Sequence, residues 1–319
     1  MIPYGKHNIN AADIKSVTKV LKSDFITQGK QIEIFEKKIK KYLGVRFAVA
    51  VSSCSAGLHL AAKAINLKKG NVMLTSPITF CSTANAALHC GAKVEFADVD
   101  YETGNISIES IKKKLKKKRI KALFPVHFGG LPCKMKEIRK LSKKNNFYII
   151  EDAAHALGSK YDDGTKVGSC KYSDMAVFSF HPVKSITTGE GGIITTNNKS
   201  LYEKLIKLRS HGIEKNFKKF LNSKAKKFPW YYEVHHLSNH YRLTDFQCVL
   251  GSSQLNRLNS FINKRRQIAA YYDRVFKNNK NLIPLQNFQR HYSSNHLYIL
   301  RINFKKIKKS RTEIMNLLR

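Results

Sequence analysis

Long apolar runs and clustered cysteines are both missing from this sequence. No segment reaches the run of about eighteen apolar residues that a membrane-spanning helix requires, and the N-terminus has no apolar signal core. We therefore expect a cytoplasmic protein that does not cross a membrane. The cysteines form no CxxC pair, which argues against a metal site or a disulfide framework and suits a reducing compartment. They are scattered as Cys54, Cys81, Cys90, Cys133, Cys170 and Cys248.

Acidic residues are scarce as well. Only 22 Asp and Glu stand against 58 Lys and Arg, which gives a formal net charge of +36. Such a charge permits nucleic-acid binding or the attraction of an anionic substrate. The lysines are spread along predicted helices, however, and no nucleic-acid recognition motif accompanies them. We favour solvated helix faces over a nucleic-acid surface, and expect the positive field to help collect a substrate such as a nucleotide diphosphate.

An alternation of apolar and amphipathic segments fills the middle of the chain. The strand-like segments lie at 46–53, 72–77, 93–100, 122–128 and 147–152. Helical patterns lie between them, at 55–65, 83–90, 107–117 and 134–145. This alternation is typical of a doubly wound, mostly parallel sheet, which binds its ligands at the carboxyl ends of the strands.

Helical patterns dominate on either side of this middle part. They lie at 10–22, 31–43, 200–209, 243–257 and 260–277. A strand-like segment at 297–304 and a last helix suggest the beginning of a small α+β domain. A chain of 319 residues commonly holds one large domain and a smaller one. We therefore predict a large domain over residues 1–245 and a small C-terminal domain over residues 246–319.

The segment SFHPVKSITTGEGGIITT at 179–196 is the one around which we expect the chain to be organised. Apolar runs at both ends predict a strand, a tight loop and a second strand. Lys184 lies in the loop, and the glycines after it permit positive φ and close backbone approach. A lysine that loses hydration there can attack a carbonyl and form a Schiff base. A single lysine is more often solvated surface, so other residues must support this interpretation.

A second candidate is SSCSAGLHLA at 52–61, where small residues join a predicted strand to a predicted helix. The amides of Ser55 and Ala56 and the Ser55 hydroxyl would meet an anion at the helix N-terminus, where the helix dipole favours negative charge. An ordinary strand–helix turn with a serine cap explains this segment equally well.

Two more candidates follow other predicted strands. Asp152 ends the apolar segment FYIIED, and a buried carboxylate there needs a cationic partner, such as a protonated pyridine nitrogen. His155 lies close enough in sequence to reach the same ligand. Phe80 follows the strand-like segment at 72–77 and could stack on a flat ring. The alternatives are that Asp152 caps the next helix and that Phe80 belongs to the core.

Together and in this order, these segments resemble the DegT-type nucleotide-sugar aminotransferases, which are pyridoxal 5'-phosphate enzymes of the aspartate aminotransferase fold, fold type I. The matching segments are TQGK at 27–30, TSPITF at 75–80, DAAHALGS at 152–159, SFHPVKSITTGEGG at 179–192, RSHG at 209–212, NHYRLTDFQCVLGSSQL at 239–255 and SSNHLYIL at 293–300. The resemblance implies an α/β fold with a mostly parallel seven-stranded sheet, helices on both of its faces, and a smaller C-terminal α+β domain.

The resemblance also implies a role for each matching residue. Lys184 binds the cofactor covalently and moves protons, and Asp152 pairs with the ring nitrogen. His155 contacts the phenolic oxygen of the cofactor, and Phe80 stacks on its ring. The remaining implied roles are phosphate binding by Ser55, Ala56 and Ser179, a contact of Asn239 with the cofactor phosphate of the neighbouring subunit, and binding of an anionic substrate group by Arg242.

Within this family, the sequence is most similar to the transaminases of the pseudaminic-acid pathway. This implies that a UDP-linked 4-keto-6-deoxy sugar receives the amino group of L-glutamate in a homodimer with shared active sites. Family members continue beyond the point where this chain stops, and MNLLR at 315–319 lacks a helix stop signal. We therefore expect the small domain to be incomplete.

Two other functions remain open at this stage. Sugar dehydratases that use pyridoxamine phosphate share the fold, but in the family they carry histidine in place of the Schiff-base lysine. The presence of Lys184 therefore favours amination. A non-catalytic protein that binds nucleic acid or regulates another protein is the third interpretation, and the joint presence of Asp152, Ser179 and Lys184 argues against it.

Overall fold

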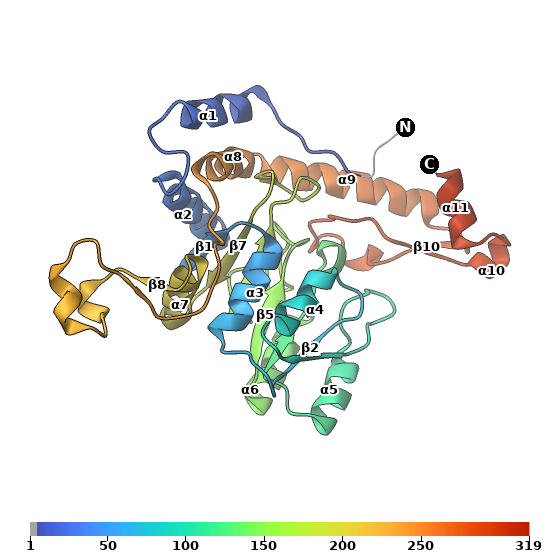
Figure 1. The fold of residues 1–319 in the computed structure, drawn as a ribbon. Coiled ribbons are helices and arrows are strands. Elements are labelled where there is room, and N and C mark those ends of the chain that lie inside the picture. Colours follow the sequence, from blue (N-terminus) through green and yellow to red (C-terminus); the bar gives the residue numbers. More distant parts are fainter. Residues whose placement is uncertain (1–4, 319) are drawn as a thin grey trace.

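A seven-stranded sheet forms the centre of the protein, whose residues 5–318 are described by a computed structural model (Figure 1). The strand order is β1-β7-β6-β5-β4-β2-β3. All strands run parallel except β7, which is antiparallel to both of its neighbours. The strands are β1 Phe47–Val51, β2 Val72–Thr75, β3 Lys93–Phe96, β4 Ala122–Phe124, β5 Tyr148–Asp152, β6 Met175–Ser179 and β7 Gly192–Thr196. The mostly parallel seven-stranded sheet predicted from the sequence is confirmed.

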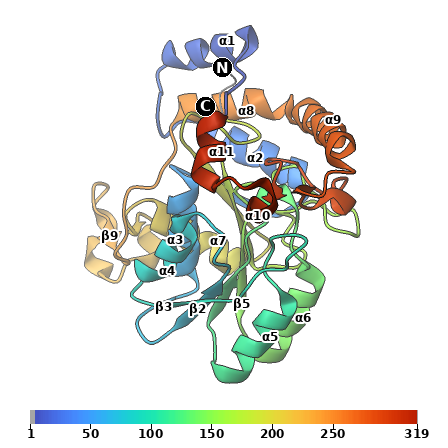
Figure 2. The same ribbon diagram turned by 90° about the vertical axis from the view of Figure 1, so that its right-hand side faces the viewer.

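Helices cover both faces of this sheet and create two apolar layers (Figure 2). On one face lie α3 Cys54–Ala64, α4 Cys81–Leu88 and α7 Lys199–Arg209. The other face is covered by α2 Gln31–Leu43, α5 Ile108–Lys117, α6 Met135–Asn145 and the start of α9 Leu258–Phe276. Successive strand residues point to opposite layers, as Ile149 and Ile150 of β5 do. Burial on both faces explains why the strands are almost continuously apolar.

The N-terminal helices match the sequence prediction closely. In α1 Ala11–Leu21, Asn10 and Asp13 form a reciprocal capping box. Helix α2 ends at Gly44, which adopts the left-handed conformation with φ 69°. Both helices pack against α8 Asp245–Leu255, and α8 leads directly into α9 Leu258–Phe276. The predicted domain boundary after residue 245 therefore falls at the start of α8, and the division into two domains stays a prediction.

The C-terminal part is a small α+β arrangement. Strands β10 Leu282–Pro284 and β11 Leu300–Ile302 pair antiparallel, and the short helices α10 Phe304–Ile307 and α11 Arg311–Leu317 follow. A single turn of 3-10 helix at Asn287–Gln289 lies between β10 and β11. Another, at Phe128–Gly130, follows β4 in the central sheet. Within residues 5–318, no helix is both long enough and apolar enough to cross a membrane.

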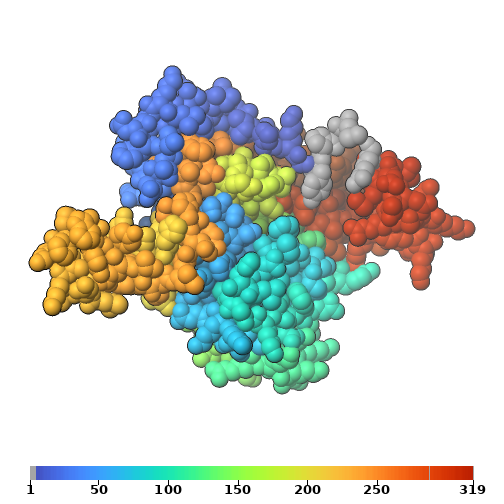
Figure 3. Space-filling model, viewed as in Figure 1, coloured from blue at the N-terminus to red at the C-terminus, as the bar shows by residue number. Residues whose placement is uncertain are grey.

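An arm at residues 213–238 projects from the body of the molecule, and the sequence did not predict it (Figure 3). Its base is a two-stranded sheet of β8 Ile213–Glu214 and β9 Glu233–Val234, and its tip has 3-10 turns at Phe217–Lys219 and Ser223–Lys227. Large apolar side chains are exposed along it: Phe217, Leu221, Phe228, Trp230, Tyr232, Val234 and Leu237. An apolar surface of this kind marks a site of association.

Candidate active site

The predicted strand–loop–strand segment forms one wall of a cavity of about 700 Å³. Strands β6 and β7 pair antiparallel, and the loop between them carries Lys184. Backbone hydrogen bonds close the loop, from Phe180 N to Gly191 O (2.9 Å), Thr188 N to Phe180 O (3.0 Å) and Lys184 N to His181 O (2.9 Å). Gly189 has φ 80°, which favours glycine at this position. The loop therefore holds Lys184 at a defined place on the cavity wall.

The Lys184 side chain is half-buried and shares this cavity with Asp152. Burial lowers the pKa of the Lys184 amine below its ordinary value, and the nearby Cys54 and Asp152 partly oppose that shift. A lower pKa increases the neutral fraction of the amine, which is the form that attacks a carbonyl. The amine is therefore suited to forming a Schiff base with a ligand in the cavity.

Asp152 ends β5 with only 5% of its surface exposed. Its Oδ2 accepts a hydrogen bond from Thr83 Oγ1 at 2.6 Å, and its Oδ1 accepts one from Ala154 N at 3.1 Å. No ion pair reaches this carboxylate within the described part of the chain. A buried carboxylate without a cationic partner is costly. A ligand with a protonated ring nitrogen would satisfy it, as the sequence analysis expected.

The N-terminus of α3 borders the same cavity. Ser53 is its N-cap and accepts a hydrogen bond from Ala56 N at 3.1 Å. The Ala56 amide, which the sequence assigned to phosphate, is thus engaged by Ser53 in this structure, whereas Cys54 and Ser55 open the helix ahead of any intrahelical acceptor. Ser179 of β6 lies on the cavity wall with Ser53 and Ser55. These groups, with the helix dipole, suit an anion such as a phosphate.

Gly192 brings strand β7 against this helix terminus. A Cβ atom at Gly192 would lie 2.7 Å from the backbone N of Cys54 and 2.7 Å from the carbonyl carbon of Ser53. Only glycine permits this approach, so close packing explains why the last residue of TGEGG is a glycine. The loop that carries Lys184 and the helix terminus that suits an anion are thereby held next to each other.

Two histidines form another part of the cavity wall. The rings of His155 and His296 lie 4.5 Å apart between centroids, and the Nδ1 atom of each is buried without a hydrogen-bond partner among the described residues. Burial lowers the pKa of His155 to about 3, and Lys184 adds to the effect. Burial also lowers the pKa of His296 to about 2, with smaller contributions from His155 and Lys184. Both rings are therefore neutral and offer hydrogen bonds to a ligand.

The other predicted site residues lie farther out. Phe80 is on the cavity wall with 73% of its surface exposed, so it is not a core residue. Asn239 is exposed and donates to Tyr241 OH at 3.0 Å, outside the cavity. Arg242 lines a separate cleft beside Arg209. The structure thus brings Lys184, Asp152, His155, Phe80, Ser55 and Ser179 to one cavity, but not Ala56, Asn239 or Arg242.

Sequence reasoning missed several residues of the cavity. Ser53 could have been found, because a serine before an apolar helical pattern is a typical N-cap. Thr83 points its hydroxyl at Asp152 from α4, and no local pattern encodes that pairing. His296 reaches the cavity because Ser294 bonds to the segment that carries His155, through Ser294 N to Ser159 Oγ (2.9 Å) and Ser294 Oγ to His155 O (2.7 Å). Only the fold reveals such a long-range contact.

Two of the segments that carry the family resemblance, TQGK and NHYRLTDFQCVLGSSQL, are joined to each other by hydrogen bonds. Asp245, within LTDFQ, is 1% exposed and accepts hydrogen bonds from Gly29 N at 2.8 Å and Gln31 N at 2.9 Å. It thereby caps the N-terminus of α2 in place of Lys30, whose side chain makes no cap. The segment TQGK is thus joined to the start of α8.

Within residues 5–318, no group of three or more His, Cys, Asp or Glu side chains is placed to hold a metal ion.

Known proteins share this fold and sequence over nearly the whole chain. The UDP-4-amino-4,6-dideoxy-N-acetyl-beta-L-altrosamine transaminase of Campylobacter jejuni (serotype O:23/36, strain 81-176) is 43% identical over 302 residues, covering 93% of this chain and 76% of the relative. The spore coat polysaccharide biosynthesis protein SpsC of Bacillus subtilis is 36% identical over 320 residues, covering 100% of this chain and 80% of the relative.

Solved structures agree with these relatives. Helicobacter pylori PseC, an aminotransferase involved in the biosynthesis of pseudoaminic acid, gives a TM-score of 0.86 at 35% identity, covering 98% of this chain and 81% of that structure. The pyridoxal-phosphate form of the sugar aminotransferase Spr1654 of Streptococcus pneumoniae gives a TM-score of 0.83 at 27% identity, covering 95% of this chain and 78% of that structure.

The fold and the cavity define the class of this protein. A half-buried lysine, a buried carboxylate without a cation and a helix N-terminus in one cavity fit the aldehyde, the ring nitrogen and the phosphate of pyridoxal 5'-phosphate. The protein is an aminotransferase of fold type I that uses this cofactor. The DegT/DnrJ/EryC1/StrS aminotransferase family matches residues 7–319, and the chain belongs to that family.

Proposed function

We propose that this protein transfers the amino group of L-glutamate to C4 of a UDP-linked 4-keto-6-deoxy sugar. The product would be UDP-4-amino-4,6-dideoxy-N-acetyl-altrosamine, and the pathway would lead to pseudaminic acid or a related surface glycan. The observation that carries the chemistry is the meeting of Lys184 and Asp152 in one cavity. The choice of sugar is supported by relatives that carry this transaminase name at 43%, 41% and 36% identity.

Each cavity residue has a chemical task in this proposal. Pyridoxal phosphate, when bound, supplies an electron sink for the carbon that loses its proton. Lys184 Nζ would hold the cofactor, and as a free amine it would take the α-proton of glutamate as a general base and later return it. Asp152 keeps the ring nitrogen protonated, since a buried anion favours the cationic form of its neighbour.

The remaining residues bind and orient. His155 would donate a hydrogen bond to the phenolic oxygen of the cofactor, and Phe80 would cover the face of its ring. Ser55 and Ser179 hold the phosphate at the N-terminus of α3, together with Ala56 once its amide leaves Ser53. One base can serve both halves of the reaction, because the second half reverses the steps of the first with a different carbonyl compound.

A homodimer with shared active sites is part of this proposal. Asn239 and Arg242 lie outside the cavity of their own chain. Asn239 is exposed, and Arg242 is half-buried in a separate cleft. We assign Asn239 to the cofactor phosphate of the partner subunit and Arg242 to an anionic group of the substrate. The arm at 213–238 carries the apolar surface needed for the contact between subunits. We place the enzyme in the cytoplasm, where nucleotide sugars are made.

The fold alone does not select amination. A mutant of GDP-4-keto-6-deoxymannose-3-dehydratase, solved with bound GDP-perosamine, gives a TM-score of 0.88 at 26% identity. What selects amination is the lysine in the loop between β6 and β7, because a primary amine is required for covalent cofactor binding. A nucleic-acid-binding function has no support from the two relatives described above, one a transaminase and the other a polysaccharide biosynthesis protein.

The test is spectroscopic and kinetic. Purified protein with pyridoxal phosphate should show a near-visible absorbance band that is lost on addition of L-glutamate. Turnover is then measured with a panel of UDP- and dTDP-linked 4-keto sugars, and the UDP-linked 4-keto-6-deoxy sugar should give the highest kcat/KM. Lys184→Ala should abolish the covalent band and turnover, whereas Lys199→Ala, at an exposed lysine, should keep both. Normal turnover by Lys184→Ala, or no sugar accepted by the wild type, would contradict the proposal.

A further inference from the structure

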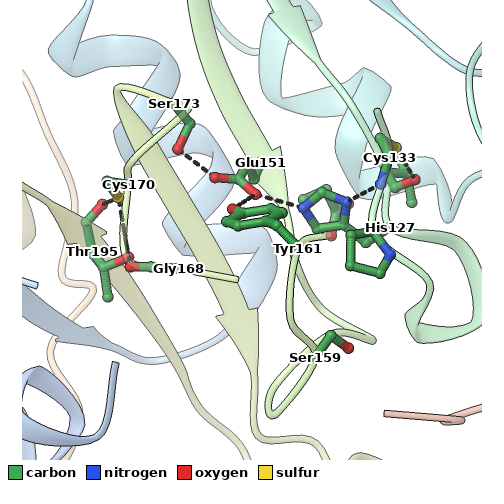
Figure 4. Close-up of polar contacts among 12 residues, drawn as sticks. His127, Cys133, Glu151, Ser159, Tyr161, Gly168, Cys170, Ser173 and Thr195 are labelled. Carbon is green, nitrogen blue, oxygen red and sulfur yellow. Dashed lines mark hydrogen bonds and ion pairs between the residues drawn. The ribbon is translucent and has the colours of Figure 1, made fainter. Parts of the chain in front are cut away.

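Figure 4 shows a buried polar network whose central residue is the neighbour of Asp152 in strand β5. Its centre is Glu151, which has 0% exposure and precedes Asp152 on β5. Glu151 Oε2 accepts hydrogen bonds from Tyr161 OH at 2.6 Å and from His127 Nε2 at 2.6 Å, and its Oε1 accepts one from Ser173 Oγ. His127, Tyr161 and Ser173 are themselves buried. The proposed reaction uses none of these four residues.

The hydrogen bonds of His127 fix the charge state of the network. The ring Nδ1 of His127 accepts a hydrogen bond from the backbone N–H of Cys133 at 3.1 Å, so Nδ1 carries no proton. Burial opposes a charged ring, yet the hydrogen bonds with Cys133 and Glu151 raise the pKa of His127 to about 10. The backbone N–H at Nδ1 nevertheless leaves no place for a second ring proton, so the imidazole is neutral and its proton on Nε2 is donated to Glu151. Both oxygens of the Glu151 carboxylate accept hydrogen bonds: Oε2 from His127 and Tyr161, and Oε1 from Ser173. It is held as an anion without a positive partner.

The other titratable groups near Glu151 stay protonated. Burial raises the pKa of Tyr161 well above its ordinary value, and the charge of Glu151 raises it further. Burial also raises the pKa of the Cys170 thiol to about 12, again with a contribution from Glu151. Cys170 Sγ lies against Thr195 O at 3.3 Å (Figure 4). Glu151 is thus the charged member of this cluster.

This network connects to the cofactor site through the backbone. Asp152 N donates to Pro125 O at 2.9 Å, and His127 N donates to Asp152 O at 3.2 Å. Val126, which lies between Pro125 and His127 in the sequence, lines the cavity. Tyr161 lies at the end of residues 153–161, the segment that follows β5 and includes His155. Glu151 therefore ties together the β4 end, the β5 end and the segment after β5, each of which supplies a cavity residue.

We propose that the Glu151 carboxylate acts as a positioning residue for the cofactor, fixing the strand end that carries Asp152 and placing a second negative charge behind the ring nitrogen. Side chains of consecutive strand residues point to opposite faces, so Glu151 cannot touch the cofactor itself. Its charge acts through the sheet, where screening by water is weak. The inference rests on the proposed role of Asp152 in the cofactor site.

The decisive variant is Glu151→Gln, which keeps the shape and removes the charge. The readout is the pH at which the near-visible band of the bound cofactor changes from its protonated to its deprotonated form. Loss of a nearby anion destabilises the protonated, cationic form, so the midpoint should fall by on the order of one pH unit. The circular dichroism of the band should also weaken, because the cofactor is held less rigidly. A midpoint unchanged from the wild type would overturn the inference.

Two further variants separate the charge from the packing. His127→Gln keeps a donor for Glu151 and is neutral like the ring it replaces, so the midpoint should stay where it is in the wild type. Tyr161→Phe keeps the charge but removes one hydrogen bond, so the cofactor should dissociate severalfold faster at an unchanged midpoint. If Glu151→Gln does not fold, the dissociation rate in Tyr161→Phe tests the positioning role, and a rate equal to that of the wild type would overturn it. A downward shift in Tyr161→Phe, or any shift in His127→Gln, would contradict the assigned charges.

The same experiment distinguishes this inference from the proposed function. Loss of the band in Lys184→Ala ties the readout to the covalently bound cofactor. If the wild type shows the band and Glu151→Gln leaves its midpoint unmoved, only the role of Glu151 fails. If the wild type shows no band, the proposed site and the inference built on it both fail.

Discussion

Thr83 is the side chain that holds Asp152 in place. Its hydroxyl donates to Asp152 Oδ2 at 2.6 Å and lies 2.6 Å from the Thr79 hydroxyl. Because Thr83 gives its proton to the carboxylate, Thr79 is the donor in the second contact. The orientation of the acid therefore depends on α4, the helix that follows Phe80.

Thr83→Val should weaken cofactor binding while leaving the fold intact. Valine keeps the volume of threonine but removes the hydrogen bond to a charged group, which is worth about 1.5–3 kcal/mol. We expect the dissociation constant of pyridoxal phosphate, measured by absorbance titration, to rise by about tenfold or more. Thr83→Ser keeps the hydroxyl and should bind nearly as well as the wild type. Equal affinity of the valine and serine variants would show that Thr83 does not hold the acid.

The paired histidines make the protein sensitive to acid. The folded-state pKa of His296 is about 2, far below the ordinary value of about 6.5. Below pH of about 6.5 the unfolded chain therefore takes up a proton that the folded protein refuses, and stability falls as pH falls. His155, with a pKa of about 3, acts in the same direction.

His296→Asn should make this loss of stability smaller. Between pH 6.5 and pH 4.5, the fall in the free energy of unfolding should shrink by about 2 kcal/mol, since one pKa unit corresponds to about 1.36 kcal/mol. Urea unfolding at a series of pH values measures the difference. His291→Asn, at an exposed histidine, is the control and should leave the pH dependence unchanged. An identical pH dependence in His296→Asn would mean that His296 is not buried as a neutral ring.

At the scale of elements, the sequence predicted which segments are helices and strands much better than how they pair. The apolar runs at both ends of the Lys184 loop predicted β6 and β7, because buried strands are short and rich in β-formers. Nothing in those runs indicated that β7 would be antiparallel to both neighbours, or that β1 would pair with it. Strand pairing depends on contacts between distant residues, which local periodicity does not encode.

Gly192→Ala tests the close approach of β7 to α3. The new Cβ would lie 2.7 Å from backbone atoms of Cys54 and Ser53, so the helix terminus and the strand must move apart. Overpacking of this kind costs about 1–3 kcal/mol. We expect a lower unfolding midpoint and weaker binding of inorganic phosphate to the cofactor-free protein, measured by calorimetry. Gly189→Ala, at an exposed glycine with open space around it, should strain the loop backbone but leave phosphate affinity unchanged. Equal phosphate affinity in Gly192→Ala and the wild type would separate the glycine from the anion site.

At the scale of the whole molecule, alternation of strands and helices was sufficient to predict the architecture. Each strand–helix unit must bury an apolar face, and a two-sided sheet is the arrangement that buries them all. The arm at 213–238 was missed because it has neither apolar periodicity nor a regular element longer than five residues. The role assigned to Asn239 depends on a second chain and the role assigned to Arg242 depends on a bound substrate, so both stay predictions.

Mixed dimers should reveal whether two chains share each site. One chain carries Lys184→Ala and the other carries Asn239→Ala, and each is expected to be much less active as its own homodimer. In the mixed dimer, one of the two sites receives an intact lysine and an intact partner asparagine. Activity should return to about half that of the wild type in dimers purified with two different tags. Mixed dimers as inactive as their parents would show that these residues do not act across the interface.

The place of β7 in the sheet also has a consequence for the order in which the nascent chain assembles. Strand β1 ends at Val51, and its only sheet neighbour among the described strands is β7, which begins at Gly192. A ribosome-bound chain therefore displays β1 and the start of α3 long before β7 emerges to cover them. The pairing of β1 and the contact of Gly192 with the N-terminus of α3 are thus completed late, only after the loop that carries Lys184 has been made.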